Sequence, residues 1–153
     1  MTVSNSMVLL ACAFCTFAMT GLIWLIQLVQ YPLMSRVGTE FFVAYEQLHC
    51  RNITPIVLPL MTVELATSIW LAWKPVAGSE WLLLIGCGLV GLLWASTFFL
   101  QVPMHDVLCQ SFDAKVHTQL VQSNWIRTVL WSARSAVMLW VLADVLLRQA
   151  AKS

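Results

Sequence analysis

Residues 81–102 read WLLLIGCGLVGLLWASTFFLQV, a stretch without any Asp, Glu, Lys or Arg. A helix needs about 20 predominantly apolar residues to cross the ~30 Å hydrocarbon layer of a bilayer. The stretch is continuously apolar, whereas a strand of a membrane barrel alternates apolar and polar residues. Because lipid offers no hydrogen-bond partners, this stretch predicts a helix, which satisfies its own backbone groups.

Three further apolar runs of similar length lie at residues 7–30, 53–73 and 125–147. Across its 153 residues the chain is 60% hydrophobic and 10% charged, whereas soluble domains contain about 45–50% apolar and about 25% charged residues. We therefore expect an all-α membrane protein with a single transmembrane domain over residues 1–153. Its four spans would form an antiparallel four-helix transmembrane bundle in the cell membrane, with the lipid bilayer as its main partner.

The connections between the four runs differ in length. Residues 74–80 form a short turn, so the longer connections at 31–52 and 103–124 fall together on the opposite side of the membrane. Apolar residues recur every three or four positions in both longer connections. This spacing predicts two short amphipathic helices that lie at the membrane interface or cap the bundle.

Net charge bears on the possible binding partners, and the number of cysteines bears on possible disulfides. The net charge is +1 and no basic run occurs, so the sequence predicts no nucleic-acid partner. A homo-oligomer is compatible with the sequence. The odd number of cysteines, five, argues against a complete disulfide framework. Cys12 and Cys15 lie in apolar surroundings and are expected to act as small hydrophobic residues, whereas Cys50 and Cys109 fall on the same side and are open to meeting.

Two ionisable residues lie deep inside predicted spans. Glu64 is near the middle of the second span and Arg134 is at a similar depth in the fourth. An unpaired charge at the centre of a bilayer costs at least ~2.5–3.5 kcal/mol. We therefore expect Glu64 and Arg134 to pair, directly or through water. Arg127 lies only two residues inside the fourth span and is expected to anchor the helix at the interface, at the mouth of a crevice.

Polar side chains form stripes on three spans, on the half of the membrane next to the two long connections, which also hold every histidine. The stripes predict a one-sided polar crevice that binds a small apolar or amphipathic molecule. A further hypothesis is that the crevice also transforms this molecule chemically. Glu64 would be the acid–base group with Arg134 as its charge partner, and His49 and His105 would be ligands or proton shuttles. The residues expected to bind the ligand are Gln27, Tyr31, Gln101, Asn124, Arg127 and Trp131.

Other functions stay open at this point. The polar stripes could serve only to fix helix packing in a non-enzymatic membrane subunit. A transition metal is a candidate cofactor, held by His49, Glu64 and His105 in a membrane oxidoreductase, because imidazole and carboxylate groups suit iron, zinc and copper. A transporter of four spans would need a dimer.

The segment Asn124-Trp125-Ile126-Arg127-Thr128, followed by Trp131 and Arg134, has the pattern NWIRT-x-x-W-x-x-R. With Gln30-Tyr31-Pro32, His49 and Gln101-Val102-Pro103-Met104-His105, it resembles a group of small bacterial four-span membrane proteins of uncharacterised function. This resemblance implies the fold and a bacterial inner-membrane location. The layout is also similar to the anthrone-oxygenase-like small membrane proteins, which would imply a cofactor-independent oxygenase acting on a polyphenolic ring.

Overall fold

The computed structural model describes residues 3–76 and 78–151, and every regular element in this part of the chain is a helix. The elements in chain order are α1 (Val3–Leu25), the π-helical turn η1 (Ile26–Gln30), α2 (Tyr31–Met34), α3 (Thr39–Trp73), α4 (Glu80–Ser96), the π-helical turn η2 (Thr97–Gln101), α5 (Val102–Leu108) and α6 (Ala114–Ala150). The predicted all-α class is confirmed.

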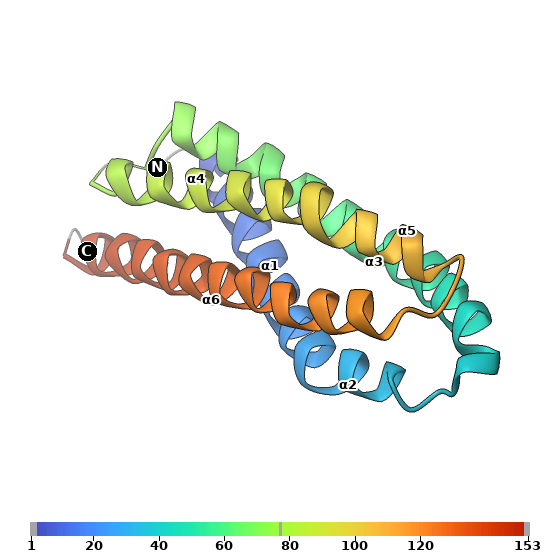
Figure 1. Ribbon diagram of the computed structural model, residues 1–153. Coiled ribbons are helices and arrows are strands. Elements are labelled where there is room, and N and C mark those ends of the chain that lie inside the picture. Colours follow the sequence, from blue (N-terminus) through green and yellow to red (C-terminus); the bar gives the residue numbers. More distant parts are fainter. Residues whose placement is uncertain (1–2, 77, 152–153) are drawn as a thin grey trace.

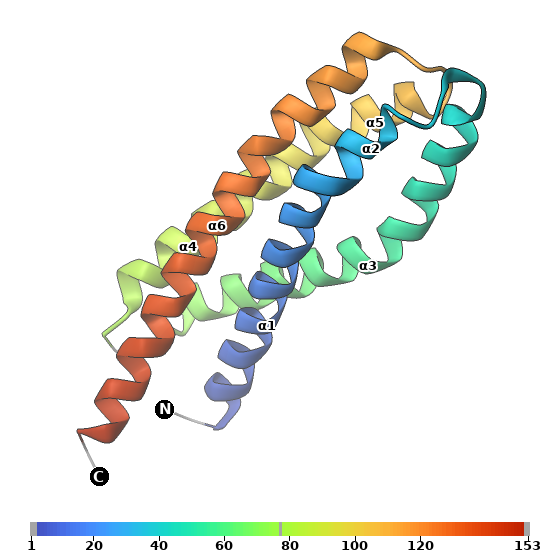
Figure 2. The same cartoon turned by 90° about the horizontal axis from the view of Figure 1, so that it is seen from below.

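The long helices form an antiparallel four-helix bundle (Figure 1). Helices α1 and α4 each pack against both α3 and α6, so the helices are arranged in a ring in the order α1, α3, α4, α6. The turn between α3 and α4 lies at the end of the bundle where α1 begins and α6 ends (Figure 2). The other two connections lie together at the opposite end, as predicted from their lengths.

Four helical stretches are long and apolar enough to cross a membrane: Asn5–Met34, Thr39–Trp73, Glu80–Leu108 and Ala114–Ala150. Each contains one of the predicted spans. Large apolar side chains cover their outer surface, as in Phe14, Phe99 and Leu147, which are 68%, 80% and 71% exposed. Such a surface is stable in contact with lipid tails and unfavourable in water. The fold is therefore compatible with a multi-pass integral membrane protein.

The two short amphipathic helices predicted in the long connections do not exist as separate elements. Their segments are helical, but they form the first part of α3 and of α6, and the chain turns only at residues 35–38 and 109–113. Neither 39–53 nor 114–125 contains a Gly or Pro that would end the helix. The apolar faces of both segments pack inward, where Phe42 and Leu120 share a buried cluster with Tyr31, Met34 and Leu108.

The turns that do occur have local causes. Gly38 precedes α3 with a φ of 84°, a backbone conformation that glycine adopts without strain. The carboxylate of Asp113 caps α6 by accepting hydrogen bonds from the backbone N–H groups of Lys115 and Val116, at 2.8 and 3.1 Å. These two turns therefore determine where α3 and α6 begin.

The π-helical turns η1 and η2 each precede a proline by two residues, in the sequences Gln30-Tyr31-Pro32 and Gln101-Val102-Pro103. Proline has no N–H to bond the carbonyl four residues earlier, which interrupts the regular helical pattern. The N–H group before each proline bonds the carbonyl five residues earlier, on Ile26 and Thr97. Both halves of the chain therefore have the same element order, a structural repeat that the sequence analysis did not predict.

Helix α3 is curved (Figure 2) and contains two prolines, Pro55 and Pro59. Proline inside a helix removes one backbone hydrogen bond and bends the helix. A bend at these prolines could make room near Glu64, twelve residues into the predicted second span. The structure instead has the open space beside residues 53–61, and Glu64 does not line it.

Candidate functional site

A cavity of about 270 Å³ lies beside the proline-containing part of α3, in the half of the bundle next to the α2–α3 and α5–α6 connections. Its polar lining residues are Tyr31, His49, Thr54, Thr97, Gln101, His105 and Arg127. The apolar lining residues are Ile26, Ile53, Val57, Leu58, Met61, Trp94, Phe98 and Val102. An apolar cavity with a few polar groups on one side has the usual composition of a small-molecule site.

Arg127 is the charged group of this cavity that lacks a counter-charge. It is only 5% exposed, and no carboxylate of the described residues forms an ion pair with it. Its Nε has no hydrogen-bond partner, while the guanidinium lies beside the Tyr31 side chain and over the Trp131 ring. Burying a cation without an anion costs several kcal/mol, so this site favours an anionic group in the cavity.

Arg127 is not an exposed side chain, as an interfacial anchor would be, because only 5% of its surface is accessible. The expectation rested on Arg127 lying at the start of a span, but α6 begins at Ala114 and continues beyond the apolar run. Arg127 therefore lies within a long helix, where its guanidinium is buried beside Tyr31 and Trp131. Arg127 lines the cavity itself.

A chain of hydrogen bonds leads away from the cavity through Tyr31, His105 and Glu46. The Tyr31 hydroxyl is 3.0 Å from His105 Nε2, and His105 Nδ1 bonds to Glu46 Oε1. Because a carboxylate accepts, Nδ1 donates and Nε2 of the neutral ring accepts from the tyrosine hydroxyl. This carboxylate–imidazole–hydroxyl order orients His105 to take a proton from Tyr31.

His49 and His117 lie near this chain. His49 lines the cavity. Its Nδ1 is 3.3 Å from the Gln30 side-chain amide, and its ring centroid is 5.8 Å from that of His105. Buried His117 contacts the backbone carbonyl of Tyr31 through Nε2, at 3.2 Å. His117 therefore connects α6 to α2 and holds the backbone of Tyr31 in place.

Glu64 and Arg134 form a separate buried cluster. Arg134 Nε is 3.7 Å from Glu64 Oε1, and the two carboxylate oxygens accept hydrogen bonds from Thr16 and Trp131, at 2.7 and 3.1 Å. Arg134 Nη2 donates to Ser68 Oγ, at 2.9 Å. The structure thus brings this predicted pair together. Neither residue lines the cavity, so the pair and the predicted histidines do not share a site.

Arg134 lies in a space made by a glycine and a cysteine. Its guanidinium occupies the position where a Cβ would stand on Gly86 of α4, and Nη2 contacts Cys12 Sγ at 3.1 Å. Its Nε and Nη1 have no hydrogen-bond partner. Cys12 is fully buried and so behaves as the small core residue that the sequence predicted, with one added polar contact.

The remaining predicted binding residues divide into two groups. Gln101 lines the cavity, but its side chain also bonds Ser96 and Ser123, at 3.1 and 3.3 Å. Gln27 accepts a hydrogen bond from Asn124 Nδ2 at 2.8 Å, and neither residue lines the cavity. Trp131 is fully buried and lies between the cavity arginine and the Glu64 cluster. Tyr31, Gln101 and Arg127 are therefore the predicted binding residues that reach the cavity.

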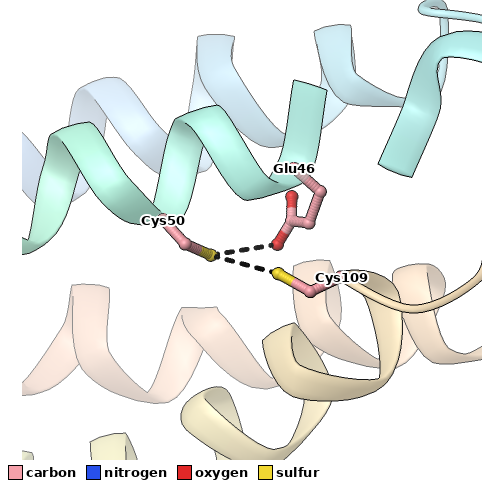
Figure 3. Close-up of side chains that lie close together, drawn as sticks. All are labelled: Glu46, Cys50 and Cys109. Atoms are coloured by element: carbon pink, nitrogen blue, oxygen red, sulfur yellow. Dashed lines mark hydrogen bonds between the residues drawn. The ribbon is translucent and has the colours of Figure 1, made fainter. Parts of the chain in front are cut away.

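The metal set predicted from the sequence, His49, Glu64 and His105, does not come together, because Glu64 belongs to the other cluster. A different group has the geometry of a metal site: Glu46, Cys50 and Cys109 have one ligand atom each within 4.8 Å of one another. Figure 3 shows Glu46 and Cys50 on α3 with Cys109 approaching from the end of α5. Cys50 and Cys109, which the sequence left open, therefore meet. Burial raises the pKa of the Cys109 thiol above its ordinary value.

Glu46 is a candidate site residue that was not predicted from the sequence. It lies outside the four apolar runs, so the cost of charge in lipid gave no reason to select it, although the structure buries it completely. A signal was present in the sequence Glu46-Gln47-Leu48-His49-Cys50. Residues three and four positions apart share a helix face, and Glu, His and Cys are metal-binding and acid–base groups.

Comparison with known proteins gives no match: no family model, no curated protein and no solved structure matches the chain. The two resemblances described from the sequence stay predictions. The site must therefore be interpreted from its own geometry.

Proposed function

We propose that the protein binds a small amphipathic molecule with an acidic head group in the cavity beside α3. The observation that supports this most directly is Arg127, a buried guanidinium that faces the cavity and has no carboxylate partner among the described residues. A carboxylate, phosphate or phenolate oxygen would supply the missing negative charge, and the planar guanidinium would hold it with two parallel hydrogen bonds.

The rest of the cavity suits the apolar part of the same molecule. Leu58, Met61, Trp94 and Phe98 are among its apolar lining residues. The Trp94 indole nitrogen is buried without a hydrogen-bond partner among the described residues, so a ligand oxygen that reached it would accept its hydrogen bond. A ligand from the bilayer would bring both parts, an apolar body and one polar end.

Chemical transformation is the second candidate, and the Glu46–His105–Tyr31 chain favours it. A ligand proton would pass to the Tyr31 oxygen as the tyrosine proton moves to His105, while Glu46 stabilises the positive imidazolium. Arg127 would stabilise the anion that remains on the ligand. Phenols are both amphipathic and acidic, so the polyphenolic ring implied by the anthrone-oxygenase-like resemblance fits this chemistry.

The role proposed for Glu64 and Arg134 changes. Their contacts are with Thr16, Ser68, Trp131 and Cys12, and they favour the reading in which polar residues fix helix packing. We assign these two residues to the fold and the cavity residues to function. A multi-pass protein of a bacterial inner membrane, as a single chain or a homo-oligomer, is the setting we propose.

Ligand binding is tested with the full chain in a non-ionic detergent. Calorimetric titration would compare 1-naphthoate with its methyl ester, which has the same ring but no charge. We expect the acid to bind and the ester to bind much more weakly. The substitution Arg127→Gln should remove this preference and lower the affinity for the acid by roughly 10–150-fold. This is the effect of losing hydrogen bonds to a charged group, which are worth about 1.5–3 kcal/mol.

The matched control is Arg148→Gln, which removes an exposed arginine from the same helix. It should leave the titration unchanged. Equal binding of acid and ester by the native protein would refute the proposed anion site, whatever the variants do. Retention of the preference in folded Arg127→Gln protein, checked by circular dichroism and gel filtration, would refute the role of Arg127.

A further inference from the structure

The side chains of Glu46, Cys50 and Cys109 lie beside the cavity but take no part in lining it. Cys50 Sγ is 3.8 Å from Cys109 Sγ and 3.5 Å from Glu46 Oε1. Two residues of α3, one helical turn apart, thus meet a third residue at the end of α5 (Figure 3). We infer that these three side chains form a binding site for one divalent metal ion of the zinc class.

The distances between the ligand atoms agree with tetrahedral coordination. Zinc binds thiolate sulfur at about 2.3 Å and carboxylate oxygen at about 2.0–2.2 Å, and at tetrahedral angles this places two sulfurs about 3.8 Å apart and a sulfur and an oxygen about 3.5 Å apart. The observed separations are 3.8 and 3.5 Å. The third pair of ligand atoms, on Glu46 and Cys109, lies within 4.8 Å, so an ion would need at most a small shift of that pair.

The charge of the site also calls for a cation. Glu46 is fully buried, and its Oε2 has no hydrogen-bond partner among the residues that the structure describes. Its Oε1 contacts His105 and Cys50. Arginine and lysine do not pair with it in the described part of the chain. A metal ion would compensate the buried carboxylate and, on binding, would replace the thiol protons.

The donor set selects the metal. Two thiolates favour softer ions, and the added carboxylate oxygen is a common zinc ligand, whereas magnesium and calcium prefer oxygen ligands alone. Three protein ligands leave one tetrahedral position for water or a small molecule, which is the arrangement of reactive zinc sites. His105 bonds the ligating carboxylate and would orient it from outside the coordination shell.

This metal site is independent of the anion proposed for the cavity. It uses different atoms, apart from the Glu46 carboxylate that both arrangements share. If the protein binds zinc but not naphthoate, the metal site is supported and the proposed anion site is refuted. If it binds naphthoate but not zinc, the anion site is supported and the metal site is refuted. The two proposals can therefore fail separately.

The test uses the full chain in a non-ionic detergent, reduced with a phosphine and freed of metal. Titration with Zn²⁺ against a chromophoric zinc indicator gives the affinity, and elemental analysis of the purified protein gives the stoichiometry. We expect one zinc per chain. Cys50→Ser and Cys109→Ser should each weaken zinc more than about 100-fold, beyond the ~10–100-fold caused by loss of an outer-shell partner. Glu46→Gln, which keeps a carbonyl oxygen, should have the smaller effect.

The matched control is Cys87→Ser, since Cys87 is a free, half-buried cysteine on α4 that lies outside the group. It should bind zinc like the native chain. Two measurements on native protein do not depend on folding of the variants. Co²⁺ should give thiolate-to-cobalt charge-transfer absorption and intense visible bands of a tetrahedral ion, and Zn²⁺ should slow alkylation of Cys50 and Cys109 but not of Cys87.

The inference is overturned by any of three results. Native protein that takes up no zinc and gives no cobalt charge-transfer band has two hydrogen-bonded thiols rather than a metal site. Equal protection of Cys87 from alkylation would mean nonspecific binding. Zinc binding that survives in folded Cys50→Ser and Cys109→Ser proteins would place the ion elsewhere.

Discussion

The guanidinium carbon of Arg127 lies 5.3 Å from the ring centroid of Trp131, and the indole N–H of the same tryptophan donates to Glu64 Oε2 at 3.1 Å. Trp131 thus separates Arg127, a buried cation that pairs with no carboxylate in residues 3–76 and 78–151, from the buried Glu64 carboxylate, which has several donors. This relationship explains why two arginines seven residues apart on α6 have different surroundings.

The first prediction concerns Trp131. Replacing it with Phe keeps the apolar ring but removes the N–H donor to Glu64 and weakens the cation–π contact with Arg127. We expect the free energy of unfolding to fall by about 1–3 kcal/mol, the cost of an unsatisfied buried group. Denaturant unfolding in mixed micelles measures it. Trp140→Phe is the control, because Trp140 is on the same helix but 63% exposed, and an equal loss there would contradict the prediction.

The buried ion pair gives a second prediction. Arg134→Met leaves the Glu64 carboxylate buried without its cation, and we expect a loss of about 3–5 kcal/mol in the free energy of unfolding. The double variant Glu64→Leu/Arg134→Met should recover part of that loss because it leaves no isolated charge. Arg148→Met, which breaks the exposed pair with Asp144, should cost no more than ~1 kcal/mol. Additive effects of the two buried substitutions would show that the pair is not coupled.

Close packing of α4 against Arg134 leads to a third prediction. A methyl group at Gly86 would occupy the position of the Arg134 guanidinium, whereas Gly88 on the same helix has open space around its Cα. Ala favours a helix over Gly by about 1 kcal/mol. We therefore expect Gly88→Ala to raise the melting temperature slightly and Gly86→Ala to lower it. Similar changes at both positions in a thermal unfolding experiment would argue against this packing.

The two nearby thiols give a fourth prediction. In metal-free protein a mild oxidant such as copper phenanthroline should convert Cys50 and Cys109 into one disulfide, with two electrons and two protons passing to the oxidant. Their sulfurs are 3.8 Å apart and need only a small shift to reach the bond length of about 2.05 Å. Peptide mapping would identify the linkage, and zinc should slow it. A product that links Cys87 instead would mean that the helices are arranged differently.

The arrangement of the four helices was accessible from the sequence because each apolar run is long enough to satisfy the membrane constraint. The pairing of Glu64 with Arg134 was also accessible, since both lie at the same depth and an isolated charge there is costly. These predictions depend on length, polarity and depth alone. They do not require knowledge of which helices are neighbours.

The site was less accessible because it depends on parts of α3 and α6 outside the apolar runs. Glu46 precedes the second apolar run, and Arg127, just inside the fourth, had the position of an interfacial anchor. Both are buried because the helical segments before these two runs pack inward. Hydropathy cannot reveal this, since it does not give the partner of a helix that extends beyond the hydrocarbon layer. The paired sequences Gln30-Tyr31-Pro32 and Gln101-Val102-Pro103 were a visible signal of the repeat.

The π-helical turns η1 and η2 have a consequence for the direction of the side chains that follow them. Each π-helical turn adds one residue to its helix, which corresponds to roughly 100° of rotation about the axis. Tyr31 and His105 both come after such an insertion, one in each half of the chain. Their side chains meet at 3.0 Å in helices that carry the same change of angular phase. Deleting one residue from η1 alone would rotate Tyr31 away from His105, and deleting one from η2 alone would rotate His105 away from Tyr31. We expect the four-helix bundle still to form in either case.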